Sequence, residues 1–229
     1  MQFEKNRDIS ISSKIIFFFR LISADIMLGA IGGLYFAARI FNHEPSFYFY
    51  ITLASAVWVV YIADHILDGI RKKANSTDYL FHYKNRKILI SAGIILVLVS
   101  AYFALFYLEK ELIIFGISTF ILVLLYLATN YFFRNKQRFF PKELLIALIY
   151  TWGIFGGVIL ITGNINLVQL LMVINFFLVV MANVLLFSYT DMEQNKKENY
   201  TIISTRLGSQ KARMFIFWVI IVSNRKSVV

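Results

Sequence analysis

The chain has 229 residues, of which 59% are hydrophobic, 17% aromatic and 16% charged, and its mean hydropathy is +0.69. A soluble domain of this size cannot bury so much apolar surface, so the composition excludes an ordinary soluble globular protein. The absence of cysteine excludes disulfides, thiolate metal sites and cysteine nucleophiles. The net charge of +10 does not indicate nucleic-acid binding, because the basic residues lie in short segments between apolar runs.

Seven apolar segments follow one another along the chain, at 14–40, 47–68, 87–108, 111–133, 142–162, 166–190 and 211–223. An apolar helix of about 20 residues crosses the hydrocarbon core of a bilayer. The sequence therefore predicts an all-α, multi-pass integral membrane protein with one transmembrane domain over residues 1–229. The seventh segment would cover only about 18 Å at about 1.5 Å per residue, so we expect this domain to be incomplete at its C-terminus.

Basic residues divide unequally between the alternate loops of these segments. Eighteen lysines and arginines fall on one side and four on the other, with Arg20 inside the first segment. Loops rich in lysine and arginine stay in the cytoplasm. We therefore expect a cytoplasmic N-terminus, and the inner membrane of a bacterium as the location.

Two acidic clusters end apolar segments on the basic side. Asp64 and Asp68 are one helical turn apart, which places both carboxylates on one face, about 6 Å apart. Asp191 and Glu193 follow the sixth segment. Solvated charges at helix ends would explain either cluster alone, whereas two clusters on one side favour a binding site. Asp25 lies deeper in its segment, and a carboxylate within a span is a candidate functional residue by default.

A short internal repeat relates the two parts of the chain that carry these clusters. Gly-Ala-Ile-Gly-Gly at 29–33 matches Gly-Ile-Phe-Gly-Gly at 153–157, 124 residues later, and Asp191 follows Asp64 by 127 residues. Small residues four apart let helices approach closely, and packing alone would explain either glycine stretch. Two matched features in register favour two related four-helix halves whose acidic ends face each other.

These motifs resemble those of the UbiA family of intramembrane prenyltransferases. That family carries Asn-Asp-x-x-Asp-x-x-x-Asp at the cytoplasmic end of its second helix, where residues 60–68 are Val-Tyr-Ile-Ala-Asp-His-Ile-Leu-Asp. Its second motif, Asp-x-Glu-Gly-Asp-Lys, is similar to Asp-Met-Glu-Gln-Asn-Lys at 191–196, which Arg206-Leu-Gly follows as in the family. The basic stretch 134–142 matches the family's loop between helices four and five. Family members usually have nine helices, so the resemblance implies that the last two and part of the seventh are missing here.

The resemblance implies a Mg²⁺-assisted transfer of an isoprenoid group from an isoprenyl diphosphate to an aromatic or other lipophilic acceptor. Mg²⁺ prefers carboxylate and phosphate oxygens, and lysine and arginine stabilise a departing diphosphate. The implied catalytic residues, which also bind the metal, are Asp64, Asp68 and Asp191. The further implied metal ligands are Glu193 and Asn195, and the implied diphosphate-binding residues are Arg71, Lys72, Arg134 and Lys142.

Four departures from the family motifs leave alternatives open. Val60, Tyr61 and Asn195 replace an Asn and two Asp residues, and His65 stands where the family often has Arg. These changes favour, as an alternative, a catalytically degenerate or truncated UbiA-like membrane protein. A secondary transporter is a further alternative, because repeats with carboxylates inside spans are typical of that class, although most acids here lie at segment ends. The sequence leaves the acceptor, the prenyl chain length and the oligomeric state open.

Overall fold

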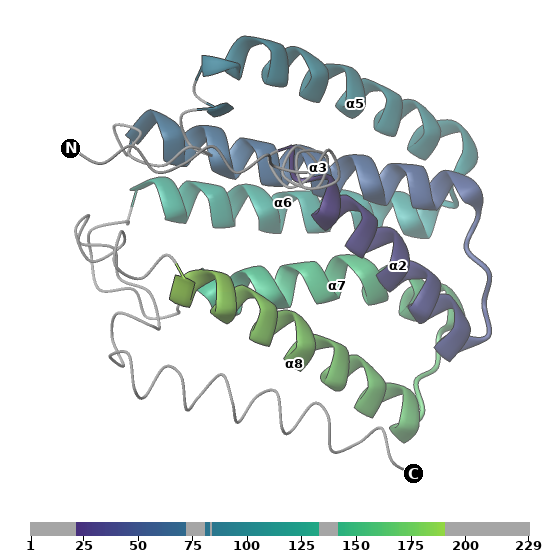
Figure 1. The fold of residues 1–229 in the computed structure, drawn as a ribbon. Coiled ribbons are helices and arrows are strands. Elements are labelled where there is room, and N and C mark those ends of the chain that lie inside the picture. The colour runs from purple at the N-terminus through teal and green to yellow at the C-terminus, as the bar shows by residue number, and fades with distance from the viewer. Residues whose placement is uncertain (1–21, 72–80, 83, 133–141, 191–229) are drawn as a thin grey trace, which may run out of the picture.

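The computed structural model describes residues 22–71, 81–82, 84–132 and 142–190 (Figure 1). These ranges contain six long helices and no strand: α2 (Ala24–Phe41), α3 (Phe47–Arg71), α5 (Arg86–Tyr107), α6 (Lys110–Phe132), α7 (Lys142–Thr162) and α8 (Leu167–Thr190). Each of the six is long and apolar enough to cross a membrane. The all-helical, multi-pass fold class is therefore confirmed, while the predicted seventh segment, 211–223, lies outside the described residues.

The helices carry apolar side chains on their outward faces as well as towards one another. Lipid offers no hydrogen bonds to the backbone, so a spanning segment satisfies its own N–H and C=O groups by forming a helix. A helix that is apolar all round is typical of a membrane span. The outward faces of α5 and α6 show this most clearly, with exposed Ile88, Ile94, Ile95, Leu98, Leu105, Phe106, Ile114, Ile117, Phe120 and Leu125.

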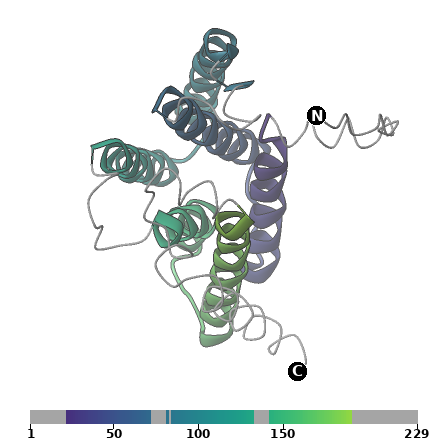
Figure 2. The same cartoon turned by 60° about the vertical axis from the view of Figure 1, so that its left-hand side comes forward.

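Two helix pairs flank α2. α3 packs along α5, α7 packs along α8, and α2 contacts both α3 and α7, crossing them obliquely in Figures 1 and 2. α6 packs against α7. The main buried cluster lies where four of these helices meet and consists of Leu34, Ala37, Phe41, Phe49, Leu53, Leu112, Ile154, Phe155 and Val158.

Two smaller clusters support the end of the bundle that carries Asp64. One consists of Ile62, Ile66 and Leu89 and joins α3 to α5. The other consists of Ala147, Met181 and Leu185 and joins α7 to α8. Buried apolar contacts therefore fix the last turns of α3 and α8 and the first turns of α7.

Within the described part of the predicted segment 14–40, the helix begins at Ala24. Ile22 and Ser23 form a turn, and Ser23 has a left-handed backbone with a φ angle of 58°. A residue in this conformation cannot continue a right-handed helix. The carbonyl oxygen of Ile22 accepts a hydrogen bond of 2.9 Å from Trp58 Nε1. The indole of α3 therefore satisfies a backbone group that the turn leaves outside the helical ladder.

Glycines of the repeated stretch permit two close helix contacts. A Cβ atom on Gly33 would lie 3.0 Å from Phe176 Cζ, and one on Gly157 would lie 2.7 Å from Phe49 Cζ. Gly157 follows Gly33 by 124 residues and Phe176 follows Phe49 by 127, the same offsets as in the sequence repeat. The first contact joins α2 to α8 and the second joins α7 to α3. The repeat therefore has a structural counterpart in two equivalent glycine–phenylalanine contacts.

Candidate active site at the acidic end of the bundle

Asp64 and Lys142 form an ion pair between two helices that are far apart in the sequence. Lys142 Nζ donates a hydrogen bond of 2.9 Å to Asp64 Oδ2, and the two side chains are only 13% and 15% exposed. The hydroxyl of Tyr126 donates to the other carboxylate oxygen at 3.4 Å. The 2.9 Å bond from Lys142 has the length typical of strong charge-assisted hydrogen bonds, whereas the bond from Tyr126 is long. Three helices, α3, α6 and α7, therefore meet at one carboxylate.

The next residue of α7 contacts the other acidic helix. Glu143 is only 2% exposed, and its Oε1 atom accepts a hydrogen bond of 2.8 Å from the Ser188 hydroxyl of α8. A carboxylate in the first turn of a helix is also favoured by the helix dipole. Ser188 lies three residues before Asp191, where the second acidic cluster begins. Lys142 and Glu143 therefore connect the start of α7 to the ends of both α3 and α8.

A row of mutually tilted rings includes His65, the residue after Asp64. The rings of Tyr61 and His65 are 4.7 Å apart, and those of His65 and His82 are 4.8 Å apart. His65 Nδ1 donates a hydrogen bond of 3.0 Å to the Tyr61 carbonyl oxygen. His82 is 1% exposed. Three aromatic rings therefore contact one another in sequence, from Tyr61 through His65 to His82.

Comparison with known proteins identifies the family. The sequence model of the UbiA prenyltransferase family matches residues 83–224, which is more than half of the chain. The chain belongs to the UbiA prenyltransferase family. No curated protein matches it, and no solved structure does. The UbiA match includes Lys142, Glu143 and Ser188 as well as the second acidic cluster.

UbiA prenyltransferases generally use Mg²⁺, and the described residues offer one group of suitable chemistry. Asp64 provides carboxylate oxygens, the ligand type that Mg²⁺ prefers. Within the described ranges, no three histidine, aspartate or glutamate side chains lie close enough together to hold a metal ion. Lys142 neutralises the Asp64 carboxylate in this structure. The oxygen donors of Asp64 fit Mg²⁺ once the Lys142 ammonium leaves the carboxylate.

The structure places two of the predicted site residues together and leaves the others undecided. Asp64 and Lys142 are in direct contact. Asp68 and Arg71 lie one and two turns after Asp64 on α3, but their side chains are not among those described. The remaining predicted residues lie outside the described ranges: Lys72, Arg134, Asp191, Glu193 and Asn195.

Sequence reasoning missed several side chains of this site. Glu143 and Ser188 belong to no motif. The available signal was that Glu143, directly after Lys142, puts an acidic residue at the start of a span, where a buried charge is unusual. Tyr126 lies within an apolar segment, where a tyrosine does not stand out in this aromatic-rich chain. His82 lies in the predicted loop, so only its position in space relates it to Asp64.

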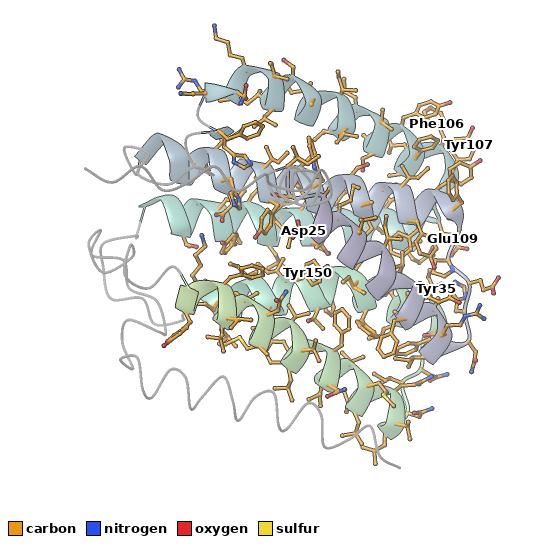
Figure 3. All side chains as sticks on the ribbon, in the orientation of Figure 1. Asp25, Tyr35, Phe106, Tyr107, Glu109 and Tyr150 are labelled. Carbon is orange, nitrogen blue, oxygen red and sulfur yellow. The ribbon has the colours of Figure 1, made fainter. Side chains whose placement is uncertain are left out.

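Asp25, the other candidate, lies apart from this cluster. Figure 3 shows Asp25 and Tyr150 close together, about midway along the bundle. The hydroxyl of Tyr150 donates a hydrogen bond of 3.3 Å to the Ile26 carbonyl oxygen in the first turn of α2. Asp25 itself is exposed. This arrangement holds the start of α2 against α7 within the span and gives Asp25 no contact with the Asp64–Lys142 pair.

Proposed function

We propose that this protein transfers an isoprenoid group from an allylic diphosphate to a lipophilic acceptor in the membrane. Its family supports a membrane prenyltransferase-like function. The observation that carries the proposal is the contact between Asp64, in the first acidic motif, and Lys142, at the start of α7. A carboxylate that suits a divalent cation and an ammonium that suits phosphate oxygens are adjacent at one end of an apolar bundle.

In the proposed reaction Lys142 exchanges partners. In this structure its ammonium binds Asp64; with substrate it binds a diphosphate oxygen. When the allylic C–O bond breaks, its electron pair goes to the diphosphate, and Lys142 stabilises the added negative charge. The acceptor then forms a bond to the isoprenoid carbon and releases a proton. Arg71, Lys72 and Arg134 are proposed to add positive charge around the same leaving group.

The proposed metal ligands are Asp64, Asp68, Asp191, Glu193 and Asn195, all with oxygen donors. When bound, Mg²⁺ would neutralise negative charge on the diphosphate. Glu143 stands outside this set, because its contact to Ser188 gives it a role in joining α7 to α8. By holding α8 at α7, Glu143 keeps Ser188, in the last turn of α8, close to the Lys142–Asp64 pair.

A second candidate function is binding of an isoprenyl diphosphate without turnover. The arrangement at Tyr61 favours it, since Tyr61 stands where the family motif has a carboxylate. Its ring contacts the ring of His65 at a tilt, and its carbonyl oxygen accepts a hydrogen bond from the same histidine. An aromatic side chain in place of a carboxylate lowers the negative charge available to a divalent cation. Such a site would hold the metal more weakly than a complete family motif.

Titration of the purified protein with geranyl diphosphate, with and without Mg²⁺, tests both candidates. Asp64→Asn should weaken Mg²⁺-dependent binding about tenfold or more, the effect of losing a charged hydrogen-bonding ligand. Glu111→Gln is the matched control, because Glu111 is an exposed acid in the first turn of α6, at the other end of the bundle. Release of inorganic diphosphate in the presence of a lipophilic phenol would establish transfer. Binding without release would favour the second candidate, and unchanged binding by Asp64→Asn would contradict both.

A further inference from the structure

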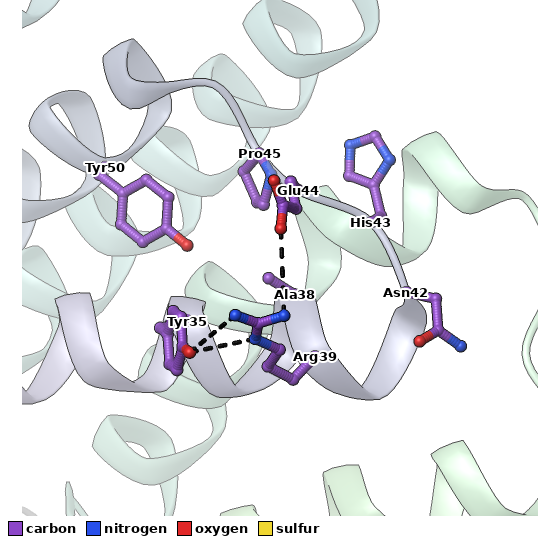
Figure 4. A pocket seen from close by; sticks show the side chains of 8 residues that line it. All are labelled: Tyr35, Ala38, Arg39, Asn42, His43, Glu44, Pro45 and Tyr50. Carbon is purple, nitrogen blue, oxygen red and sulfur yellow. Dashed lines mark hydrogen bonds and ion pairs between the residues drawn. The ribbon is translucent and has the colours of Figure 1, made fainter.

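A second polar site lies at the end of the bundle opposite to Asp64. A pocket of about 420 Å³ is bounded by the last turn of α2, the connection to α3 and the first turn of α3 (Figure 4). Its polar side chains include Tyr35, Arg39, Glu44 and Tyr50. Tyr50 lies 14 residues before Asp64 on α3, so about 21 Å of helix separates this pocket from the candidate active site.

The connection that forms one wall has a defined shape. Asn42 ends α2 with a left-handed backbone, φ 50°, and its N–H bonds to the Ala38 carbonyl oxygen. The hydroxyl of Ser46 accepts a hydrogen bond of 3.3 Å from the Phe49 N–H at the start of α3. A helix C-cap and a helix N-cap therefore lie only a few residues apart. The pocket is preformed, as ligand sites usually are.

Arg39 is held in the pocket by the tyrosine one turn before it. Its Nε and Nη2 atoms donate to the Tyr35 hydroxyl oxygen at 3.1 and 2.9 Å (Figure 4). Because this oxygen accepts both bonds, the Tyr35 O–H group can donate to a further acceptor. Arg39 Nη1 lies 4.0 Å from Glu44 Oε1, which is too long for a hydrogen bond, and these side chains are 64% and 89% exposed. The pocket thus presents a cation and an anion that form a long ion pair without a hydrogen bond between them.

We propose that this pocket binds the headgroup of a phospholipid of the phosphatidylethanolamine class. The phosphate oxygens accept hydrogen bonds from Arg39 and Tyr35, and the primary ammonium donates to Glu44. An anionic headgroup would place a second negative charge beside Glu44. A choline headgroup carries both charges but has no N–H to donate. A ligand with a phosphate and a primary ammonium satisfies both side chains.

The position of the pocket along the bundle suits this ligand. It lies where two candidate spans, α2 and α3, meet their short connection, which is the level of lipid headgroups. Tyr35 lines the pocket, Phe47 lies between the lining residues Pro45 and Tyr50 in the sequence, and their side chains are 54% and 73% exposed. Tyrosine and tryptophan are enriched at this depth. One lipid can therefore place its headgroup in the pocket and its acyl chains against these rings.

Equilibrium titration followed by native mass spectrometry tests the proposal. The detergent-purified full chain is titrated with phosphatidylethanolamine, phosphatidylcholine and phosphatidylglycerol that carry the same acyl chains. We expect phosphatidylethanolamine to bind most tightly and Arg39→Ala to weaken it about tenfold, the effect of losing a charged hydrogen-bond donor. Glu44→Gln should abolish the preference for phosphatidylethanolamine over phosphatidylcholine. Lys110→Ala, which removes a cation from the first residue of α6 at the same end, is the matched control and should change neither.

Three results would overturn the proposal. Equal binding by wild type and Arg39→Ala would place the lipid elsewhere. Tighter binding of phosphatidylglycerol than of phosphatidylethanolamine would make the pocket a simple cationic site. Loss of affinity in Lys110→Ala equal to that in Arg39→Ala would show a general effect of surface charge. Arg39, Glu44 and Lys110 are all exposed, so the three substitutions are compatible with folding, which the thermal unfolding midpoint of each variant checks.

Discussion

The two ends of the bundle each carry one acid–base pair, and the pairs differ in every property that sets their strength. Lys142 and Asp64 are 2.9 Å apart, nearly buried, and lie 78 residues apart in the sequence on two different helices. Arg39 and Glu44 are 4.0 Å apart, largely exposed, and belong to one helix and the connection that follows it. The first pair links α3 to the start of α7. The second leaves its charges accessible to a ligand from outside.

Solvent explains this difference. Water screens an exposed pair and offers each partner alternative hydrogen bonds, so such pairs add little to stability. A buried pair has lost that hydration, and removal of one partner leaves an uncompensated charge, at a cost of about 3–5 kcal/mol. Similar residue types therefore serve as a structural clamp at one end of the molecule and as a docking site at the other.

The largest expected effect is a difference in chemical labelling, because the two pairs should lie on opposite sides of the membrane. The chain lacks cysteine, so single cysteines can be labelled without background. Lys84→Cys, near the Asp64 end, should react with a membrane-impermeant maleimide only from the cytoplasm, and Asn164→Cys, in the α7–α8 connection, only from the other side. Both side chains are exposed. Labelling of both from one face would contradict the eighteen-to-four division of basic residues.

Breaking the buried pair should have the next largest effect. Lys142→Ala leaves the Asp64 carboxylate without its ammonium and should lower the free energy of unfolding by about 3 kcal/mol. Adding Asp64→Asn removes the uncompensated charge and should recover part of this loss, a coupling that a double-mutant cycle in mixed micelles measures. Strictly additive losses would show that the two side chains do not interact in the folded protein.

The hydrogen bond beside this pair should contribute less. Ser188→Ala removes the donor to the buried Glu143 carboxylate and should cost about 1–3 kcal/mol of unfolding free energy. Ser91→Ala is the matched control, because that hydroxyl bonds only to Lys87 of its own helix, at an exposed position. Equal losses of unfolding free energy in the two variants would show that Glu143 does not link α7 to α8.

The exposed pair should give the smallest change. Glu44→Gln should leave the thermal unfolding midpoint unchanged within error, at low and at high salt, because Arg39 remains hydrated and bonded to Tyr35. Differential scanning fluorimetry in detergent measures this. A clear loss of stability would mean that the two pairs are not as different as their exposures indicate.

Much of the fold follows from the sequence, because lipid imposes helices on apolar segments. The predicted segments 142–162 and 166–190 agree with α7 and α8 to within one residue. The turn at Ile22 and Ser23 was not predictable, since it depends on Trp58 of another helix. Asp64 and Lys142 were each singled out as site residues, but their pairing is a tertiary contact that no local pattern encodes. The second acidic cluster stays a prediction.

Two crossed contacts bear on the ancestry of the chain: Gly33 with Phe176, and Gly157 with Phe49. Two identical chains packed about a two-fold axis along the membrane normal would make one such contact twice. Joining the two copies in one gene keeps both contacts and lets each copy change alone. The candidate site shows such divergence, because the residue 124 positions before Lys142 is Phe18. A symmetric dimer would have carried two lysines or none, whereas the single chain carries one.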